Sequence, residues 1–151
     1  MISVILTATG DAKALARLMG ALVPAAAEGL VRDVAVLGAA GRSADIADDA
    51  GADLYAADAF AEATRRARGP WLAGLPIAAQ FAPDWLAMLA AHLALAPAAP
   101  ARLVASGWRP GGAEGWLVPK ALVPSAAAAE QDLHRLARGS GAVRLRILRR
   151  R

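Results

Sequence analysis

The segment at residues 31–51 constrains the fold more than any other part of the sequence. It reads VRDVAVLGAAGRSADIADDAG, which predicts a buried strand ending near Leu37, a turn between Gly38 and Gly41, and a short helix. Ser43 stands where it can cap that helix, and Gly51 stands where a helix commonly ends in the left-handed conformation. Strand, turn and helix in this order form the repeating unit of a parallel α/β sheet, which binds ligands at the carboxyl ends of its strands.

The same alternation continues along the chain. Apolar and β-branched runs predict further strands at residues 2–6, 52–56, 71–75, 102–106 and 116–118. Helical spacing predicts helices at residues 11–22, 59–68, 83–95 and 125–139. We expect Asp11 to cap the first of these helices, Pro24 to end it, and Gly69 to close the helix at 59–68. This order predicts a single α/β domain with a mostly parallel sheet and helices on both faces.

The C-terminal segment is basic and differs from the rest of the chain. Apolar residues alternate with arginines at residues 143–147, which predicts an edge strand with one wet face. Without five arginines of the last eight positions, the formal charge of +4 becomes −1; these are Arg144, Arg146, Arg149, Arg150 and Arg151. We therefore divide the chain into a domain at 1–142 and a basic edge strand and tail at 143–151. The tail suits an anionic membrane surface, with a disordered, solubilising end as the default interpretation, and we expect no nucleic-acid partner.

Composition excludes several classes of function. The absence of cysteine excludes disulfides, thiolate catalysis and cysteine-bound zinc, and the two histidines, His92 and His134, form no ligand cluster. The longest uncharged run, residues 85–101, is broken by prolines and leaves about twelve helical residues, whereas a bilayer needs about twenty. No basic residue precedes the first apolar run, so no signal peptide is predicted. We expect a cytoplasmic protein, with peripheral contact to the inner membrane as the alternative.

Short segments spread over nearly the whole chain follow a recognisable order. They are SVILTAT at 3–9, LARL at 15–18, VRDV at 31–34 with IADDAG at 46–51, ARGPWL at 67–72, GWLVPKAL at 115–122 and EQDLHRL at 130–136. Taken together they resemble the small bacterial family-2 glycosyltransferases, which have the three-layer, Rossmann-like GT-A fold. The resemblance implies a nucleotide-sugar donor, a divalent cation held by a DXD-type motif, and a carboxylate base.

The positions that bind the nucleotide in this family correspond to residues at the ends of the first two predicted strands. The resemblance places Thr7, Thr9, Asp11, Gly38 and Arg42 there. Gly38 stands where the family has an aspartate that holds the nucleotide, and the Ser-Thr-Asp that follows it is missing. The nucleotide-binding residues are therefore only partly retained.

The position of the metal-binding carboxylate is also altered. It falls on Ala78, within LPIAA at residues 75–79. Hard divalent cations need oxygen ligands, and the cation neutralises the leaving diphosphate. We therefore predict no metal site and no cofactor, and a nucleotide-sugar with a divalent cation would apply only if the chain transfers sugar.

A carboxylate survives near the position of the catalytic base. Glu130 or Asp132 could deprotonate an acceptor hydroxyl, provided that it lies within hydrogen-bonding distance of that hydroxyl. The alternative is a solvated acidic pair at the start of a helix, where the helix dipole favours negative charge. We favour the second interpretation.

The other candidate sites also have structural interpretations. The turn GAAGRS at 38–43 could hold a phosphate at a helix N-terminus, but it lacks the Walker lysine, so a structural turn is favoured. We interpret the acidic residues after this turn as a solvated surface and the arginines at 65–68 as a solvated helix end. Trp108 and Trp116 could stack on a sugar or cover the edge of the sheet, and we favour the second.

Three hypotheses for function follow. The preferred one is a degenerate GT-A domain that has lost metal-dependent transfer and acts as a binding or scaffold module for a protein partner. The first alternative is an active glycosyltransferase with Glu130 or Asp132 as its base, in which Arg42 or Arg109 neutralises the diphosphate. The second alternative is a nucleotide-binding regulator that keeps the cleft without the chemistry.

Overall fold

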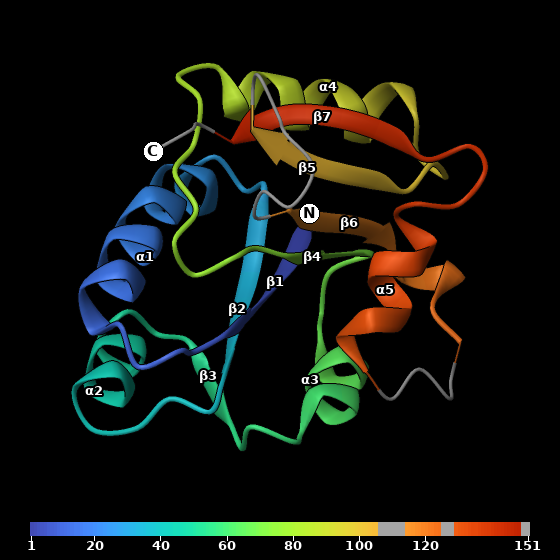
Figure 1. Cartoon of the computed structure of the whole chain (residues 1–151). Helices are drawn as coiled ribbons and strands as arrows, with labels where there is room; N and C mark the ends of the chain where they lie inside the picture. Colours follow the sequence, from blue (N-terminus) through green and yellow to red (C-terminus); the bar gives the residue numbers. More distant parts are fainter. Residues whose placement is uncertain (106–113, 125–128, 149–151) are drawn as a thin grey trace.

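The computed structural model describes residues 1–105, 114–124 and 129–148 (Figure 1). These residues contain one seven-stranded sheet in the order β3-β2-β1-β4-β6-β5-β7. Only β6 runs antiparallel to its neighbours, so the carboxyl ends of the other strands meet at one edge of the sheet. The strands are β1 Ile2–Thr7, β2 Val31–Leu37, β3 Asp53–Tyr55, β4 Trp71–Gly74, β5 Ala101–Ala105, β6 Gly115–Pro119 and β7 Val143–Leu148.

Helices cover both faces of this sheet, which confirms the predicted single α/β domain (Figure 1). They are α1 Ala12–Ala27, α2 Arg42–Asp49, α3 Phe60–Arg66, α4 Trp85–Leu95 and α5 Glu130–Leu136, and a 3-10 turn, η1, spans Lys120–Leu122. Buried residues of α1, α2 and α4 belong to the core on one face, and those of α3 and α5 belong to the core on the other. No helix among the described residues is long and apolar enough to cross a membrane.

The core on the α3 and α5 face is built around one large side chain. Trp116 of β6 is fully buried and meets the ring of Phe60 edge to face, with 6.3 Å between the ring centroids. Its indole lies over Gly74, the residue paired with it on β4, and a Cβ added to Gly74 would lie 2.1 Å from Cε2 of the ring. The end of β4 therefore accommodates only glycine. Trp116 is a core residue and not an exposed stacking platform.

Most of the predicted elements are present, with shifted ends. Asp11 caps α1, because its Oδ1 accepts a hydrogen bond from the N–H of Ala14 at 2.9 Å. Gly51 follows α2 with φ +74°, as expected for a left-handed helix terminus. β7 lies at the edge of the sheet, with Leu145 and Ile147 buried and the arginines between them exposed. The basic edge strand is confirmed.

Three predictions about helix ends were wrong. α1 continues through Pro24 to Ala27, because Ala25 is fully buried and the carbonyl of Pro24 still accepts a hydrogen bond from Glu28. Ser43 does not cap α2. Gly41 takes the cap position with φ +52°, a conformation that glycine adopts without strain, so Ser43 lies inside the helix.

The third wrong prediction concerns Gly69. The helix α3 ends at Arg66, and Ala67 follows in an extended conformation. Gly69 instead packs against β1, where a Cβ would lie 2.7 Å from the backbone nitrogen of Ser3. The helix predicted at 125–139 begins at Glu130 within the described residues, and its expected first turn at 125–128 lies outside them.

Candidate functional site

The loops that leave β1 and β2 are held side by side at the carboxyl edge of the sheet. The N–H of Ala8 donates to the carbonyl of Leu37 at 2.9 Å, and the N–H of Gly38 donates to the carbonyl of Tyr55, also at 2.9 Å. Between these loops and the starts of α1 and α2 lies a hollow of about 160 Å³. It is lined by Ala8, Gly10, Ala12, Gly38, Ala40, Arg42 and Ser43. We refer to it as the α1/α2 hollow.

The structure separates the five residues that the resemblance assigns to the nucleotide. Gly38 and Arg42 both line the α1/α2 hollow. Thr7, the last residue of β1, and Thr9, on the loop after it, are exposed and do not line the hollow. Asp11 is also outside the lining, since its carboxylate accepts the Ala14 N–H at the start of α1.

Ser43 lines the hollow from a position that differs from the expected one. It was expected to cap α2, yet it lies in the first turn of that helix, only 5% exposed, and faces the α1/α2 hollow. The signal was present in Gly41, because a glycine one position earlier can begin a helix and move a following serine inside it.

The loop that leaves β4 is apolar. It contains Ala78, the residue at the expected metal position, and its side chains Ile77, Ala79 and Phe81 pack against the core on the α1 face. Phe81 also stacks on Trp85 of α4, with ring centroids 4.0 Å apart. The described residues contain no group of three or more carboxylates, histidines or cysteines that could hold a metal ion.

The same loop is fastened to the edge strand. The N–H of Ala82 donates to the carbonyl of Ile147 on β7 at 2.8 Å, and Phe81 pairs with Leu148 as an isolated antiparallel bridge. The segment that would present metal ligands is therefore fixed by apolar packing and backbone hydrogen bonds.

The two candidate bases lie in different environments on α5. Glu130 accepts a hydrogen bond from Nε1 of Trp116 at 3.1 Å, and its carboxylate lies 3.9 Å from Nε2 of His134. Because Trp116 pairs with the last residue of β4, Glu130 lies over the sheet near the carboxyl end of that strand. Asp132 instead pairs with Arg135 at 3.0 Å. Neither carboxylate lines the α1/α2 hollow.

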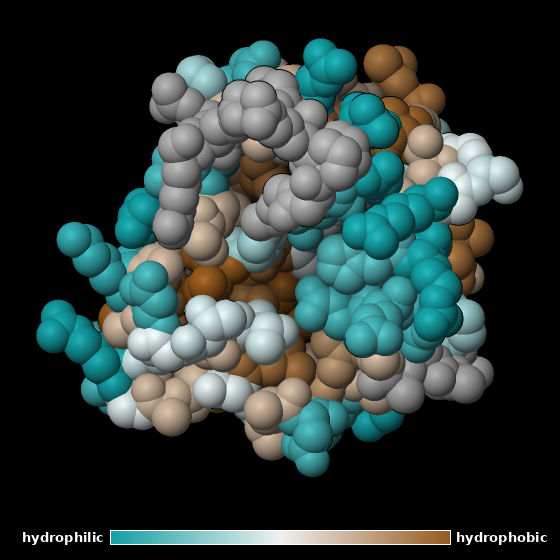
Figure 2. All heavy atoms as spheres, in the orientation of Figure 1, coloured by the Kyte–Doolittle hydropathy of each residue, from teal (hydrophilic) through white to brown (hydrophobic). Residues whose placement is uncertain are grey.

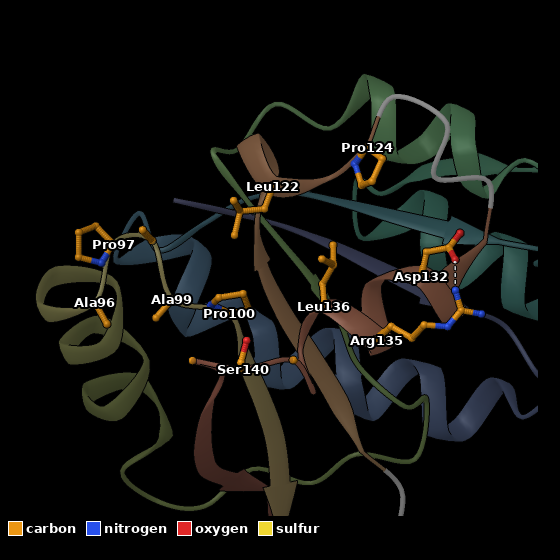
Figure 3. Close-up of a pocket in the computed structure, with 13 residues that line it drawn as sticks. Ala96, Pro97, Ala99, Pro100, Leu122, Pro124, Asp132, Arg135, Leu136 and Ser140 are labelled. Carbon is orange, nitrogen blue, oxygen red and sulfur yellow. Dashed lines mark hydrogen bonds and ion pairs between the residues drawn. The ribbon is translucent and has the colours of Figure 1, made fainter.

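Asp132 lines a second, larger cavity, of about 1010 Å³ (Figure 3). This cavity lies at the amino ends of β5 and β7, the opposite edge of the sheet from the α1/α2 hollow. Apolar side chains form much of its wall, among them Pro97, Pro100, Leu122, Pro124 and Leu136. The ion pair of Asp132 with Arg135 lies at its rim in Figure 3. Asp132 is therefore poorly placed to act as a base on a substrate bound at the carboxyl edge of the sheet.

An ionic cluster around the carboxylate of Glu114 joins β5 to the turn that follows α5. Glu114 accepts from Arg102 at 2.5 Å and from Arg138 at 3.0 Å, and its side chain is only 7% exposed. Burial acts to raise the pKa of Glu114, but the hydrogen bonds and charges of the two arginines outweigh it and hold the pKa below its ordinary value. Sequence reasoning did not single out this cluster, because its members are far apart in the chain.

His134 lies beside Trp116, with ring centroids 6.5 Å apart. Burial lowers the pKa of His134 below its ordinary value, and the nearby carboxylate of Glu130 only partly opposes this effect. The imidazole of His134 is therefore mainly neutral near neutral pH.

His92 was expected to be partly buried or at an interface. It is 6% exposed on α4, donates from Nε2 to the carbonyl of Ala99 at 2.9 Å, and meets Trp71 edge to face. It is a structural residue.

Hydrophilic side chains gather over the α5 side of the molecule in Figure 2, and apolar residues show at the centre of the same face. Arg144 and Arg146 are exposed on β7. Trp108, Arg109 and the three terminal arginines lie outside the described residues, so the structure does not place them.

Comparisons with known proteins identify the fold. No protein-family model matches the chain, and no curated protein matches its sequence. The structure is similar to mannosyl-3-phosphoglycerate synthase from Rubrobacter xylanophilus, with a TM-score of 0.69 and 13% identity over 100% of this chain and 67% of that one. It is also similar to glucosyl-3-phosphoglycerate synthase from Mycobacterium tuberculosis, with a TM-score of 0.65 and 15% identity over 95% of this chain and 69% of that one.

A second crystal structure of the mycobacterial synthase, in complex with Mn²⁺, UDP and glucosyl-3-phosphoglycerate, has a TM-score of 0.63 and 15% identity over 100% of this chain and 72% of that one. The chain thus spans about two thirds of the length of these synthases. It has the fold of the GT-A glycosyltransferases.

Proposed function

We propose that this chain is a GT-A domain that has lost metal-dependent sugar transfer and acts as a binding or scaffold module. The observation that carries the proposal is the loop after β4. In place of carboxylates it has Ile77, Ala78 and Ala79, and it packs against the core and the edge strand. A divalent cation bound there would find no side-chain oxygen in residues 75–79.

The comparisons indicate why the missing carboxylates matter for sugar transfer. The mycobacterial synthase is described in complexes with UDP and either Mn²⁺ or Mg²⁺. A cation of this kind neutralises charge on a departing diphosphate, so its loss removes a large part of the stabilisation of the transition state. A chain that lacks the carboxylate ligands of the cation would therefore retain the fold but not metal-dependent sugar transfer.

A nucleotide-binding regulator is the second candidate function. The α1/α2 hollow favours it, because Gly38 and Arg42 remain together at the carboxyl edge, where α/β folds bind ligands. Such a protein would bind a nucleotide or a nucleotide-sugar without cleaving it.

An active, metal-independent glycosyltransferase is the third candidate. Glu130 is the better placed of the two carboxylates, because it lies near the carboxyl end of β4, whereas Asp132 lies at the cavity on the opposite edge. Under this hypothesis Glu130→Gln abolishes transfer without unfolding the protein, and Asp132→Asn leaves transfer unchanged.

The test is the binding of a panel of nucleotide-sugars with and without Mg²⁺ or Mn²⁺, measured by thermal shift and calorimetry, together with an assay for release of the nucleoside diphosphate. At about 100 times Kd, a ligand raises the free energy of unfolding by about 2.7 kcal/mol. We expect no metal-dependent stabilisation and no turnover. Stabilisation without metal and without turnover would select the regulator, and turnover of any donor would overturn the loss of transfer.

A further inference from the structure

We propose that a basic patch on β5, β7 and the turn after α5 binds an extended, acidic segment of a partner protein. The patch consists of Arg102, Arg138, Arg144, Arg146 and the carboxylate of Glu114. The proposal rests on the proposed function as a binding module, and it names the surface that binds and the chemistry of the partner.

The register of the sheet places the arginines of β5 and β7 on one face. Arg102 pairs with Trp116 of β6 on one side and with Arg144 of β7 on the other. Trp116 belongs to the core on the α3 and α5 face, and paired residues of neighbouring strands lie on the same face of a sheet. Along β7, the buried Leu145 and Ile147 belong to the opposite core, and Arg146 between them is exposed. Both arginines of β7 therefore lie on the α5 face, next to Arg102.

The carboxylate of Glu114 joins the arginines and leaves the patch positive. Glu114 accepts from Arg102 and from Arg138, and its own side chain is only 7% exposed. Burial acts to raise the pKa of Glu114, but the two arginines hold the pKa below its ordinary value, so the carboxylate is ionised at neutral pH. Four arginines and one carboxylate give the patch a net charge of +3. The positive groups are the more accessible ones, since the side chain of Arg138 is 55% exposed.

The spacing of the arginines fits an extended chain. Arg144 and Arg146 are two residues apart on a strand, which separates them by about 7 Å. Side chains two residues apart in an extended segment have the same spacing and lie on one side of it. Two acidic side chains of such a segment can therefore each meet one arginine of β7, and an arginine can hold a carboxylate through two parallel hydrogen bonds.

The other occupants fit this patch less well. A second copy of the chain, related by a twofold axis, would bring the same positive charge against itself. A flat anionic membrane would meet α5, which stands on the same face and begins with the partly exposed carboxylates of Glu130 and Asp132. A narrow acidic segment along the strands avoids both sources of repulsion.

The experiment is a titration of a labelled synthetic peptide with the full chain, followed by fluorescence anisotropy. The peptide is short and alternates glutamate with serine, and a matched peptide has glutamine in place of glutamate. We expect saturable binding of the acidic peptide only. Its affinity should fall steeply between about 0.01 M and 0.15 M salt, because the Debye length shrinks from about 30 Å to about 8 Å.

Two double variants locate the binding site. Arg144→Gln with Arg146→Gln should weaken binding by about 2- to 30-fold, because each exposed charge pair makes a modest contribution. The matched control is Arg17→Gln with Arg32→Gln, which removes the same charge from exposed positions on α1 and β2, far from β7 in the strand order. The control should leave the affinity nearly unchanged. Because all four arginines are exposed, both variants should keep the urea midpoint of the unchanged chain.

Three results would overturn the proposal. The first is no binding of the acidic peptide at low salt, or equal weakening in the two double variants. The second is equal competition by free glutamate at the same carboxylate concentration, which would mean that the patch holds single anions and not a segment. The third is sedimentation with phosphatidylserine vesicles that is lost in Arg144→Gln with Arg146→Gln, in the absence of peptide binding, which would assign the patch to a lipid surface.

The outcome is separable from the test of the proposed function. Release of a nucleoside diphosphate from a nucleotide-sugar would overturn the loss of transfer, whatever the peptide does. A chain that shows neither turnover nor peptide binding would retain the proposed loss of transfer and refute only the acidic partner.

Discussion

At the scale of the residue, the contact between Gly74 and Trp116 fixes how the ends of β4 and β6 pack together. The indole is fully buried and occupies the space that any side chain at position 74 would need. Glycine in a strand is usually unfavourable, so its presence at the end of β4 reflects this close approach. The indole N–H of the same tryptophan donates to Glu130, the first residue of α5, and thereby positions the start of that helix.

We predict that Gly74→Ala destabilises the protein by at least about 3 kcal/mol, the upper end of the usual cost of overpacking a core. The added Cβ would lie 2.1 Å from the Trp116 ring, which cannot move within a packed core. Urea denaturation followed by Trp fluorescence measures the effect.

The matched control is Gly20→Ala. Gly20 lies inside α1, and a Cβ there meets nothing within 4 Å, so the substitution should stabilise the protein by about 1 kcal/mol through helix propensity. Equal stability of Gly74→Ala and the unchanged protein would contradict the packing described for Trp116.

At the scale of the element, hydrogen bonds fasten the segment before β4 to the neighbouring strands. The hydroxyl of Ser3 on β1 donates to Asp33 of β2 at 2.5 Å and accepts the N–H of Gly69 at 2.7 Å. The carboxylate of Asp33 also accepts the N–H of Arg68 at 3.2 Å. The buried hydroxyl of Ser3 therefore acts both as a donor and as an acceptor, and the bonds join β1, β2 and the segment before β4.

We predict that Ser3→Ala lowers the free energy of unfolding by about 1–3 kcal/mol, because it leaves the N–H of Gly69 without its acceptor in a buried position. Chemical denaturation measures the change. Ser140→Ala, at an exposed serine, is the control and should change stability by less than about 0.5 kcal/mol. A cost of similar size for both variants would mean that the bonds of Ser3 contribute nothing specific.

At the scale of the whole molecule, stability should depend on pH through two groups near α5, the partly buried His134 and the carboxylate of Glu114. The folded pKa of His134 is lowered by burial, so the unfolded chain binds this proton more readily. The stability contributed by His134 is therefore complete above its ordinary pKa of 6.5 and is lost as the pH falls from that value through the folded pKa. Glu114, whose folded pKa is lowered, adds a further loss only below its ordinary value of 4.5.

We predict that the free energy of unfolding decreases between pH 7.5 and pH 5, and that His134→Gln reduces this slope. The reason is that glutamine cannot take up the proton that destabilises the folded state. Urea denaturation at several pH values measures both slopes. Identical slopes in the two proteins would show that His134 titrates alike in the folded and unfolded chains.

Much of the fold could be predicted because it follows from local patterns. Alternating and apolar runs identified the strands, including the basic edge strand, and Asp11 identified the start of α1. The resemblance to GT-A glycosyltransferases also came from short segments, and the structure has that fold. The predictions that failed were those at element ends, such as Pro24 and Ser43, where burial and a neighbouring glycine outweighed the local preference.

By itself, the sequence determined the order of strands and helices, the single α/β domain and the absence of carboxylates from residues 75–79, since these depend on residue types and short-range periodicity. Only the tertiary structure decided which side chains meet. It placed Glu130 and Asp132 in separate environments and brought Ser43 and Arg42 to the α1/α2 hollow. The reason is physical: the order β3-β2-β1-β4-β6-β5-β7 joins segments far apart in the chain, and local patterns carry no information about that order.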